Sequence, residues 1–99
     1  MAIPHLPEIR IYLWEELENV MGIGKRPDII EVLEERFQLS QAEKEQKDPT
    51  GAKIFSHRVD SAVAQSRIVG WIEPVVTSGR GIWKLTEEYF SCFPEAKIL

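Results

Sequence analysis

The stretch WIEPVVTSGRGIWKLT, residues 71–86, decides the predicted fold. Both ends of the stretch are rich in β-branched and aromatic residues, a composition typical of strands. The two glycines between them can adopt the positive φ angles that a tight hairpin turn needs. The sequence therefore predicts a β-hairpin, WIEPVV paired with GIWKLT, that has Pro74 in an edge strand and Arg80 at its tip.

Three main helices and one short helix are predicted before this hairpin. Apolar residues at helical spacing place the first two at about residues 7–21 and 27–37, and glycines end the first of them. The polar letters SQAE, which begin at Ser40, match a capping box and predict a short surface helix. The third main helix is predicted within residues 52–70 and ends at Gly70, a residue suited to a left-handed C-terminal position.

A short final helix is predicted after the hairpin, with Thr86 as its N-terminal cap. The order is then helix, helix, short helix, helix, strand, turn, strand, helix. A three-helix core followed by a β-hairpin is the winged helix-turn-helix arrangement, which belongs to the α+β class and is mostly helical. Because 99 residues suit one small domain, we expect a single winged-helix domain over residues 1–99.

The composition is that of an ordinary globular domain, with 43% apolar residues and no apolar run near the ~20 residues of a membrane span. The N-terminus has no signal-peptide pattern, so we expect a cytoplasmic protein. The single cysteine, Cys92, cannot form an internal disulfide and is expected to be a small apolar filler. His5 and His57 have no partner at metal-ligand spacing, so neither a metal nor another cofactor is expected.

The charge is unevenly distributed along the chain. The whole chain carries −4, but residues 50–86 contain five Lys or Arg and two acidic residues, which gives +3. The parts before and after this segment carry −5 and −2. A basic central segment between two acidic segments predicts an uneven electrostatic potential over the protein surface. The positive charge is less concentrated than in the basic stripe typical of a DNA-binding protein.

An ordered set of motifs resembles a known family. Five short motifs of this chain occur in the same order as in the N-terminal domain of Mrr-type restriction proteins, which they resemble. They are Phe55, Arg58-Val59, Ala62, residues 70–73 and residues 81–87. The resemblance covers about residues 8–89. It implies a winged-helix domain that is attached to a nuclease and recognises modified DNA.

The chain departs from this family in two respects. It has no acidic residue followed, after a spacer, by Asp/Glu-x-Lys behind a predicted strand, the pattern of the nuclease. We therefore expect no nuclease activity of its own, and any nuclease would be a separate domain or subunit. Ser66 stands where the family has a core leucine, and Tyr89 stands where it has a glycine. We therefore expect differences in the packing of the third main helix and in the exit from the hairpin.

The outward face of the third main helix is the predicted contact with DNA, because such a helix can enter the major groove. Lys53 and Ser56 suit phosphates near the helix N-terminus, where backbone N–H groups attract anions. His57 and Ser61 could reach base edges. Asp60 on the same face counts against a phosphate contact, although a carboxylate can accept from cytosine. The alternative interpretation is an ordinary solvated helix face.

Two further basic positions complete the predicted site. Arg58 could contact a phosphate or form a salt bridge with Glu34 or Glu35. Arg80 is the strongest phosphate or minor-groove candidate, with Lys84 nearby, and the alternative is a solubilising turn. The predicted DNA-binding set is Lys53, Ser56, His57, Arg58, Ser61, Arg80 and Lys84.

The tryptophans are expected to be structural. Trp71 and Trp83 are predicted in the core as an aromatic cross-strand pair rather than as a surface on which a ligand stacks. Trp14 lies off the main apolar stripe of the first helix, and together with Ile11 it could mark a dimer contact.

The sequence is compatible with two functions. One is a DNA-binding module that recognises double-stranded DNA, plain or modified. The other is a winged-helix module for protein–protein interaction or homodimerisation that has little DNA affinity, because one fold can host both uses. An enzyme is not expected, because no nucleophile–base pair or metal cluster is visible. Convergence of Lys53, Arg58, Arg80 and Lys84 on one open surface would favour DNA binding.

Overall fold

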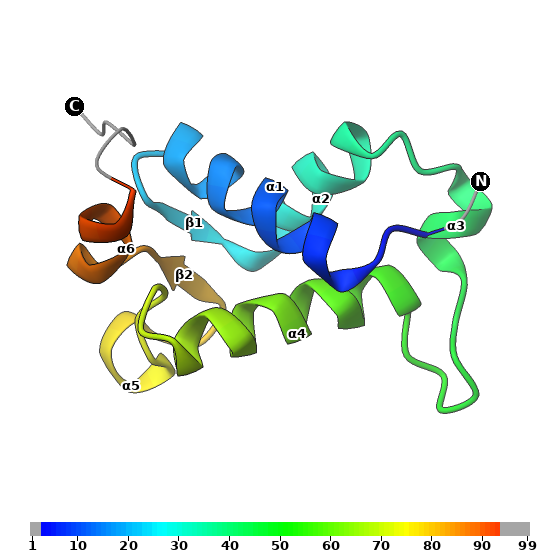
Figure 1. Ribbon diagram of the computed structural model, residues 1–99. Coiled ribbons are helices and arrows are strands. Elements are labelled where there is room, and N and C mark those ends of the chain that lie inside the picture. The colour runs from blue at the N-terminus through cyan, green and yellow to red at the C-terminus, as the bar shows by residue number, and fades with distance from the viewer. Residues whose placement is uncertain (1–2, 94–99) are drawn as a thin grey trace.

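The computed structural model describes residues 3–93 and shows a small α+β protein with a two-stranded antiparallel sheet (Figure 1). Helices α1 and α4 are the longest elements, and the strands are short. The elements are, in chain order, α1 (Leu6–Asn19), β1 (Ile23–Lys25), α2 (Arg26–Arg36), α3 (Gln41–Glu45), α4 (Ile54–Ile68), α5 (Val75–Ser78), β2 (Ile82–Lys84) and α6 (Glu87–Cys92).

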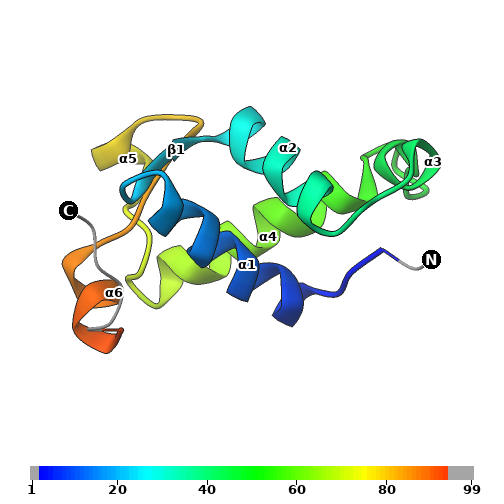
Figure 2. The same ribbon diagram turned by 90° about the horizontal axis from the view of Figure 1, so that it is seen from above.

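One apolar core lies between α1, α2 and α4. Seen from above, α1 and α2 lie side by side over α4 (Figure 2). Each helix contributes its apolar stripe, for example Leu13 and Leu17 from α1, Leu33 from α2, and Phe55 and Val59 from α4. All five side chains are fully buried. The helical periodicity of the sequence thus identified the core-facing sides of the three main helices.

The helix termini follow the sequence signals. Ser40 and Glu43 form both hydrogen bonds of the predicted capping box, and α3 buries none of its residues. Thr86 caps α6 by accepting a hydrogen bond from the Tyr89 amide. Gly70, which follows α4, has a φ of 84°, as expected of a left-handed C-terminal glycine. The prediction of these helices is therefore confirmed.

The predicted hairpin is wrong. WIEPVV does not form a strand: Ile72 makes an isolated bridge to Leu85, and the chain then turns into α5 at Pro74. Proline has no N–H for the next ladder bond, and its fixed φ suits the start of a helical turn. The expected cross-strand pair also does not form, because Trp71 packs against Trp14 and aromatic residues of the C-terminal region, while Trp83 is buried elsewhere in the core.

The partner of β2 is instead β1, which the sequence analysis missed. The register pairs Ile23 with Lys84, Gly24 with Trp83 and Lys25 with Ile82. A β-carbon added to Gly24 would lie 2.8 Å from the side chain of Ile29. Gly24 is therefore needed for the close packing of β1 on α2.

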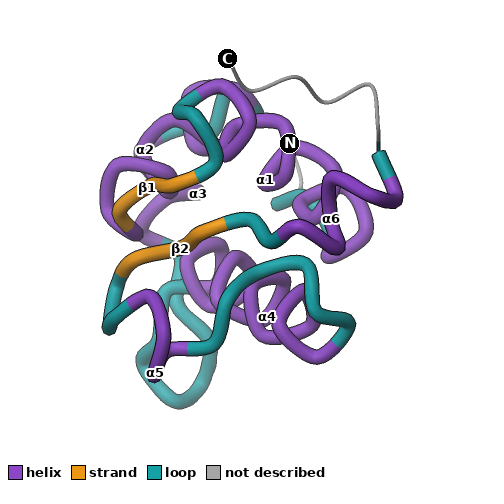
Figure 3. The backbone as a smooth tube through the Cα atoms, turned by 90° about the vertical axis from the view of Figure 1, so that its left-hand side faces the viewer, coloured by secondary structure: helices purple, strands orange, loops and turns teal. Residues whose placement is uncertain are grey.

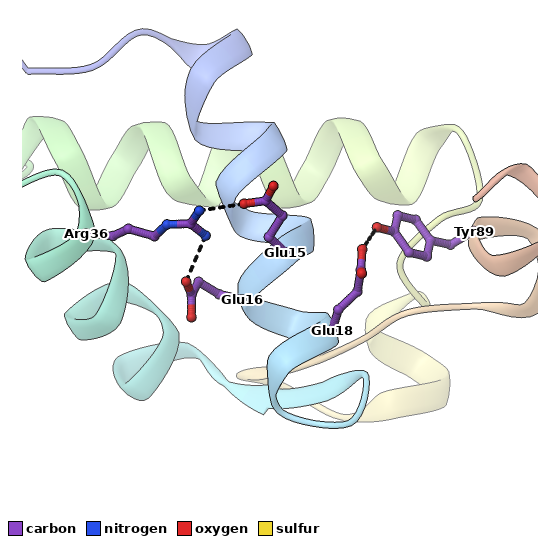
Figure 4. A network of polar contacts seen from close by, with 5 residues as sticks. All are labelled: Glu15, Glu16, Glu18, Arg36 and Tyr89. Carbon is purple, nitrogen blue, oxygen red and sulfur yellow. Dashed lines mark hydrogen bonds and ion pairs between the residues drawn. The ribbon is translucent and has the colours of Figure 1, made fainter. Parts of the chain in front are cut away.

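Two polar contacts fix α1 against its neighbours (Figure 4). The Arg36 guanidinium of α2 lies between two carboxylates of α1, at 2.6 Å from Glu15 and 2.9 Å from Glu16. At the other end of α1, the Tyr89 hydroxyl of α6 donates to the Glu18 carboxylate. Burial, supported by this contact with Glu18, raises the pKa of Tyr89 above its ordinary value.

The two positions at which the chain departs from the Mrr-type pattern both make polar contacts. Tyr89 docks α6 onto α1, as described above. Ser66 is buried, where its hydroxyl accepts from Trp14 Nε1 at 2.9 Å and donates to the Ala62 carbonyl at 2.8 Å. Trp14 is therefore partly buried between α1 and α4. Cys92 is exposed, so the expectation that it fills an apolar space is wrong.

Candidate nucleic-acid interface

The outward face of α4 is open in the part of the chain that the structure describes. Phe55, Val59 and other apolar residues turn toward α1 and are buried. Lys53, His57 and Ala64 lie on the opposite side and are exposed. Because a helix places residues three and four apart on one face, these positions form a continuous stripe along α4.

Ser56, Asp60 and Ser61 flank this stripe and are partly exposed. Ile68 extends the stripe beyond Ala64 with a side chain that is 84% exposed, a feature that the sequence analysis did not single out. The predicted reading face is therefore a mixed surface, basic at its N-terminal end and aliphatic at its C-terminal end.

The negative charge of Asp60 is matched by an arginine of α2. Arg26 Nε and Nη2 each donate to one Asp60 oxygen at 2.9 Å, in a bidentate pair. The hydrogen bond to Asp60 raises the pKa of Arg26 despite some burial. Asp60 was expected to oppose phosphate contact, but in this arrangement the local charge is balanced, and Arg26 is a further cation at the edge of the face.

Arg26 also anchors the segment that was expected to form the hairpin tip. Its backbone N–H donates to the Gly81 carbonyl at 2.9 Å. Arg26 therefore binds the loop between α5 and β2 through its backbone and the middle of α4 through its side chain. The end view shows this loop at the edge of the sheet, beside β2 and above α5 (Figure 3). Arg80 lies in this loop, next to Gly81, and is exposed.

A second contact holds α5 against the end of α4. Arg67, in the last turn of α4, donates from Nε to the Glu73 carbonyl at 3.0 Å. The Glu73 carboxylate lies 3.5 Å from Lys84 Nζ, and the Lys84 side chain is 50% exposed. Lys84 is thus present near the predicted wing, but its charge is partly compensated.

Arg58 does not form the salt bridge considered for it, and its contact with a phosphate stays a prediction. Its Nη1 donates to the carbonyl oxygens of Ile3 and Pro4, at 3.1 and 2.9 Å, and within residues 3–93 it makes no ion pair with Glu34 or Glu35. The guanidinium therefore fastens the N-terminal segment to α4. This role could not be predicted from the sequence, because any residue can supply a backbone carbonyl acceptor.

The structure brings together some of the predicted basic residues and separates others. Lys53 is the N-cap of α4 and lies toward the opposite end of the helix from α5 (Figure 1). Fifteen residues of helix span about 22 Å. Arg80 lies in the α5–β2 loop, which the Arg26 backbone contacts at Gly81, and Lys84 lies at the end of β2 beside Glu73. Lys53 and His57 lie at the beginning of α4. Arg58 does not join either group.

Residues 3–93 were compared with the requirements of a metal site and of a membrane-spanning helix. No group of three His, Cys, Asp or Glu side chains there could hold a metal ion. None of the helices in this part of the chain combines the length and apolarity needed to cross a membrane.

The comparisons with known proteins leave the family open. No protein-family model matches the chain, and the comparisons with curated proteins and with solved structures found no match. The resemblance to Mrr-type domains therefore stays a prediction that rests on the motifs alone.

Proposed function

We propose that the protein is a DNA-binding winged-helix module in which α4 reads the duplex and the α5–β2 segment serves as a shortened wing. The observation that carries the proposal is the open stripe on α4, which begins with Lys53 and His57, together with a loop that presents Arg80 and that Arg26 connects to the middle of α4. An α-helix of ordinary diameter fits the major groove, which is about 12 Å wide.

Each residue has a distinct role in this arrangement. Lys53 and Ser56 contact phosphates at the beginning of α4, where the backbone N–H groups add positive potential. His57 and Ser61 face base edges. Arg80 contacts the backbone or minor groove from the loop, and Lys84 contributes less because Glu73 competes for its charge. Arg58 acts through its support of α4.

The resemblance to Mrr-type proteins adds two further parts to the proposal. The duplex that binds best carries a modified base, and a nuclease domain or subunit acts with this module. Both parts rest on the motifs of residues 55–62, 70–73 and 81–87. A comparison of plain and methylated duplexes of the same sequence tests the first of them.

The main experiment is a fluorescence anisotropy titration of a labelled duplex at several salt concentrations. Two to three phosphate contacts predict a slope of log Kobs against log [salt] of roughly −2 to −3. Arg80→Met removes one contact and should reduce this slope by about one. Arg10→Met is the matched control, because Arg10 hydrogen-bonds Gln65, on a flank of α4 away from Asp60, and should leave the slope unchanged. No binding at low salt would refute the proposal.

A module for protein–protein interaction or homodimerisation is the second candidate. It is favoured by three aliphatic side chains of α4 and α5 that water reaches: Ile68, Val75 and Val76 are 84%, 44% and 94% exposed. Exposed aliphatic residues of this kind mark contacts with other proteins when they gather into a patch. A monomer–dimer equilibrium in sedimentation that Val76→Asp abolishes, together with no DNA affinity, would establish this alternative.

A further inference from the structure

A groove lies between α1 and the last turns of α4. Its volume is about 400 Å³, within the range of roughly 300–1,000 Å³ that small-molecule sites occupy. Residues of α1, residues of the last turns of α4 and Trp71 line it. The lining includes Arg10, Ile11, Trp14, Gln65, Val69 and Trp71.

The groove is apolar along most of its length. The rings of Trp14 and Trp71 meet edge to face, with their centroids 4.8 Å apart. The indole N–H of Trp14 is already bonded to Ser66, so this ring offers only apolar surface to an occupant. Ile11 and Val69 line the groove and are each 55% exposed. An apolar body placed between them would remove both side chains from water.

One cation lies in this groove. Arg10 is partly exposed and donates from Nη1 to Gln65 Oε1 at 2.7 Å, and no carboxylate pairs with it within residues 3–93. The Gln65 oxygen already accepts this hydrogen bond. Arg10 and Gln65 can therefore offer a bound molecule chiefly N–H donors. The planar guanidinium matches a carboxylate, which accepts two parallel hydrogen bonds.

We infer that this groove binds a small carboxylic acid with an aryl or short alkyl body. The apolar part lies against Trp14 and Trp71, and the carboxylate pairs with Arg10. The choice of this occupant rests on charge complementarity: an apolar groove with one uncompensated cation selects an amphipathic anion over a neutral molecule. The site does not include the proposed DNA-reading stripe, so it stands or falls independently of DNA binding.

The test follows the three tryptophan indole N–H signals by ¹H–¹⁵N NMR while 4-phenylbutyrate is added. The signals of Trp14 and Trp71 should shift in a saturable way, and that of Trp83, which is buried elsewhere, should not. For a ligand of this size we expect a dissociation constant on the order of 1 mM. The neutral 4-phenylbutyramide has nearly the same shape and should bind roughly tenfold more weakly.

Variants separate the charge from the shape of the groove. Arg10→Met should weaken phenylbutyrate roughly tenfold and leave the amide unchanged, because it removes the charge but keeps an apolar stem. Arg80→Met is the control and should change neither affinity. Val69→Glu, at an exposed position, should weaken the acid more than the amide, and it replaces the Arg10 variant if that protein does not fold.

Three results would overturn the inference. One is the absence of saturable shifts at Trp14 and Trp71. Another is equal affinity for the acid and the amide, unaffected by Arg10→Met. The third is a change of the same two signals on simple dilution, with a dimer in sedimentation, which would show that a second copy covers the groove.

Discussion

Replacement of Gly24 by alanine tests the packing of β1 on α2. The added β-carbon would lie 2.8 Å from two atoms of the Ile29 side chain, whereas carbon atoms in contact are about 3.5–4.0 Å apart. Ile29 is buried, so it cannot turn away into solvent. Relief of roughly 0.7 Å of overlap in a packed core costs about 1–3 kcal/mol of the free energy of unfolding.

The assay is urea unfolding followed by tryptophan fluorescence, supported by thermal unfolding. For a domain of this size, 1 kcal/mol lowers Tm by roughly 4–8 °C. The double variant Gly24→Ala with Ile29→Val removes one of the two clashing atoms, so it should be more stable than the sum of the single effects predicts. An unchanged stability for Gly24→Ala, or strictly additive effects, would refute this packing of β1 on α2.

Three other predictions follow from the contacts described above. Tyr89→Phe removes the hydrogen bond to Glu18 and should cost about 1 kcal/mol at neutral pH. The pKa of Tyr89 is higher in the folded than in the unfolded protein, so the wild-type free energy of unfolding should fall as pH rises past about 10. If Tyr89→Phe loses stability equally steeply above that pH, this explanation is contradicted. Asp60→Asn leaves Arg26 uncompensated and should tighten DNA binding and steepen its salt dependence in the anisotropy assay; weaker binding would show that the pair is needed to hold the surface. Ser40→Ala removes the capping box and should speed amide hydrogen exchange in α3 about fivefold, while unchanged exchange would show that the cap contributes nothing.

Local signals were sufficient to predict every described helix except α5. The apolar stripes of α1, α2 and α4 repeat at helical spacing over more than ten residues each, and the caps at Ser40 and Thr86 depend on residues three apart or fewer. The same periodicity identified the outward face of α4. Patterns of this length and range are local in the chain, so they can be recognised without knowledge of tertiary contacts.

The sheet could not be predicted in this way. β1 has only three residues, between a turn that ends at Gly22 and the start of α2, and its partner β2 lies almost sixty residues later. The strand-like composition of WIEPVV was misleading, because Pro74 ends the ladder after Ile72 and the two valines after it enter a helical turn. β-propensity describes a side chain that suits a half-buried sheet, and it does not overcome a missing backbone donor.

The contacts made by residues around the predicted site could not be foreseen where they depend on that sheet. Arg26 meets Asp60 because β1 and β2 bring the start of α2 to the middle of α4. Arg58 turned instead to carbonyl groups of Ile3 and Pro4, which any residue could supply. The exposed positions Lys53, His57 and Arg80 were found correctly as surface residues, because helical phase and turn composition determine exposure directly.

The most direct test of the central claim is an NMR titration of the ¹⁵N-labelled protein with a short duplex at low salt. If α4 reads DNA, the backbone amides of residues 53–64 and of the loop 79–81 should shift together and saturate, while the indole signals of Trp14 and Trp71 stay in place. Absence of shifts on plain and methylated duplexes, or shifts confined to α1, would contradict the proposal that this face of α4 binds DNA.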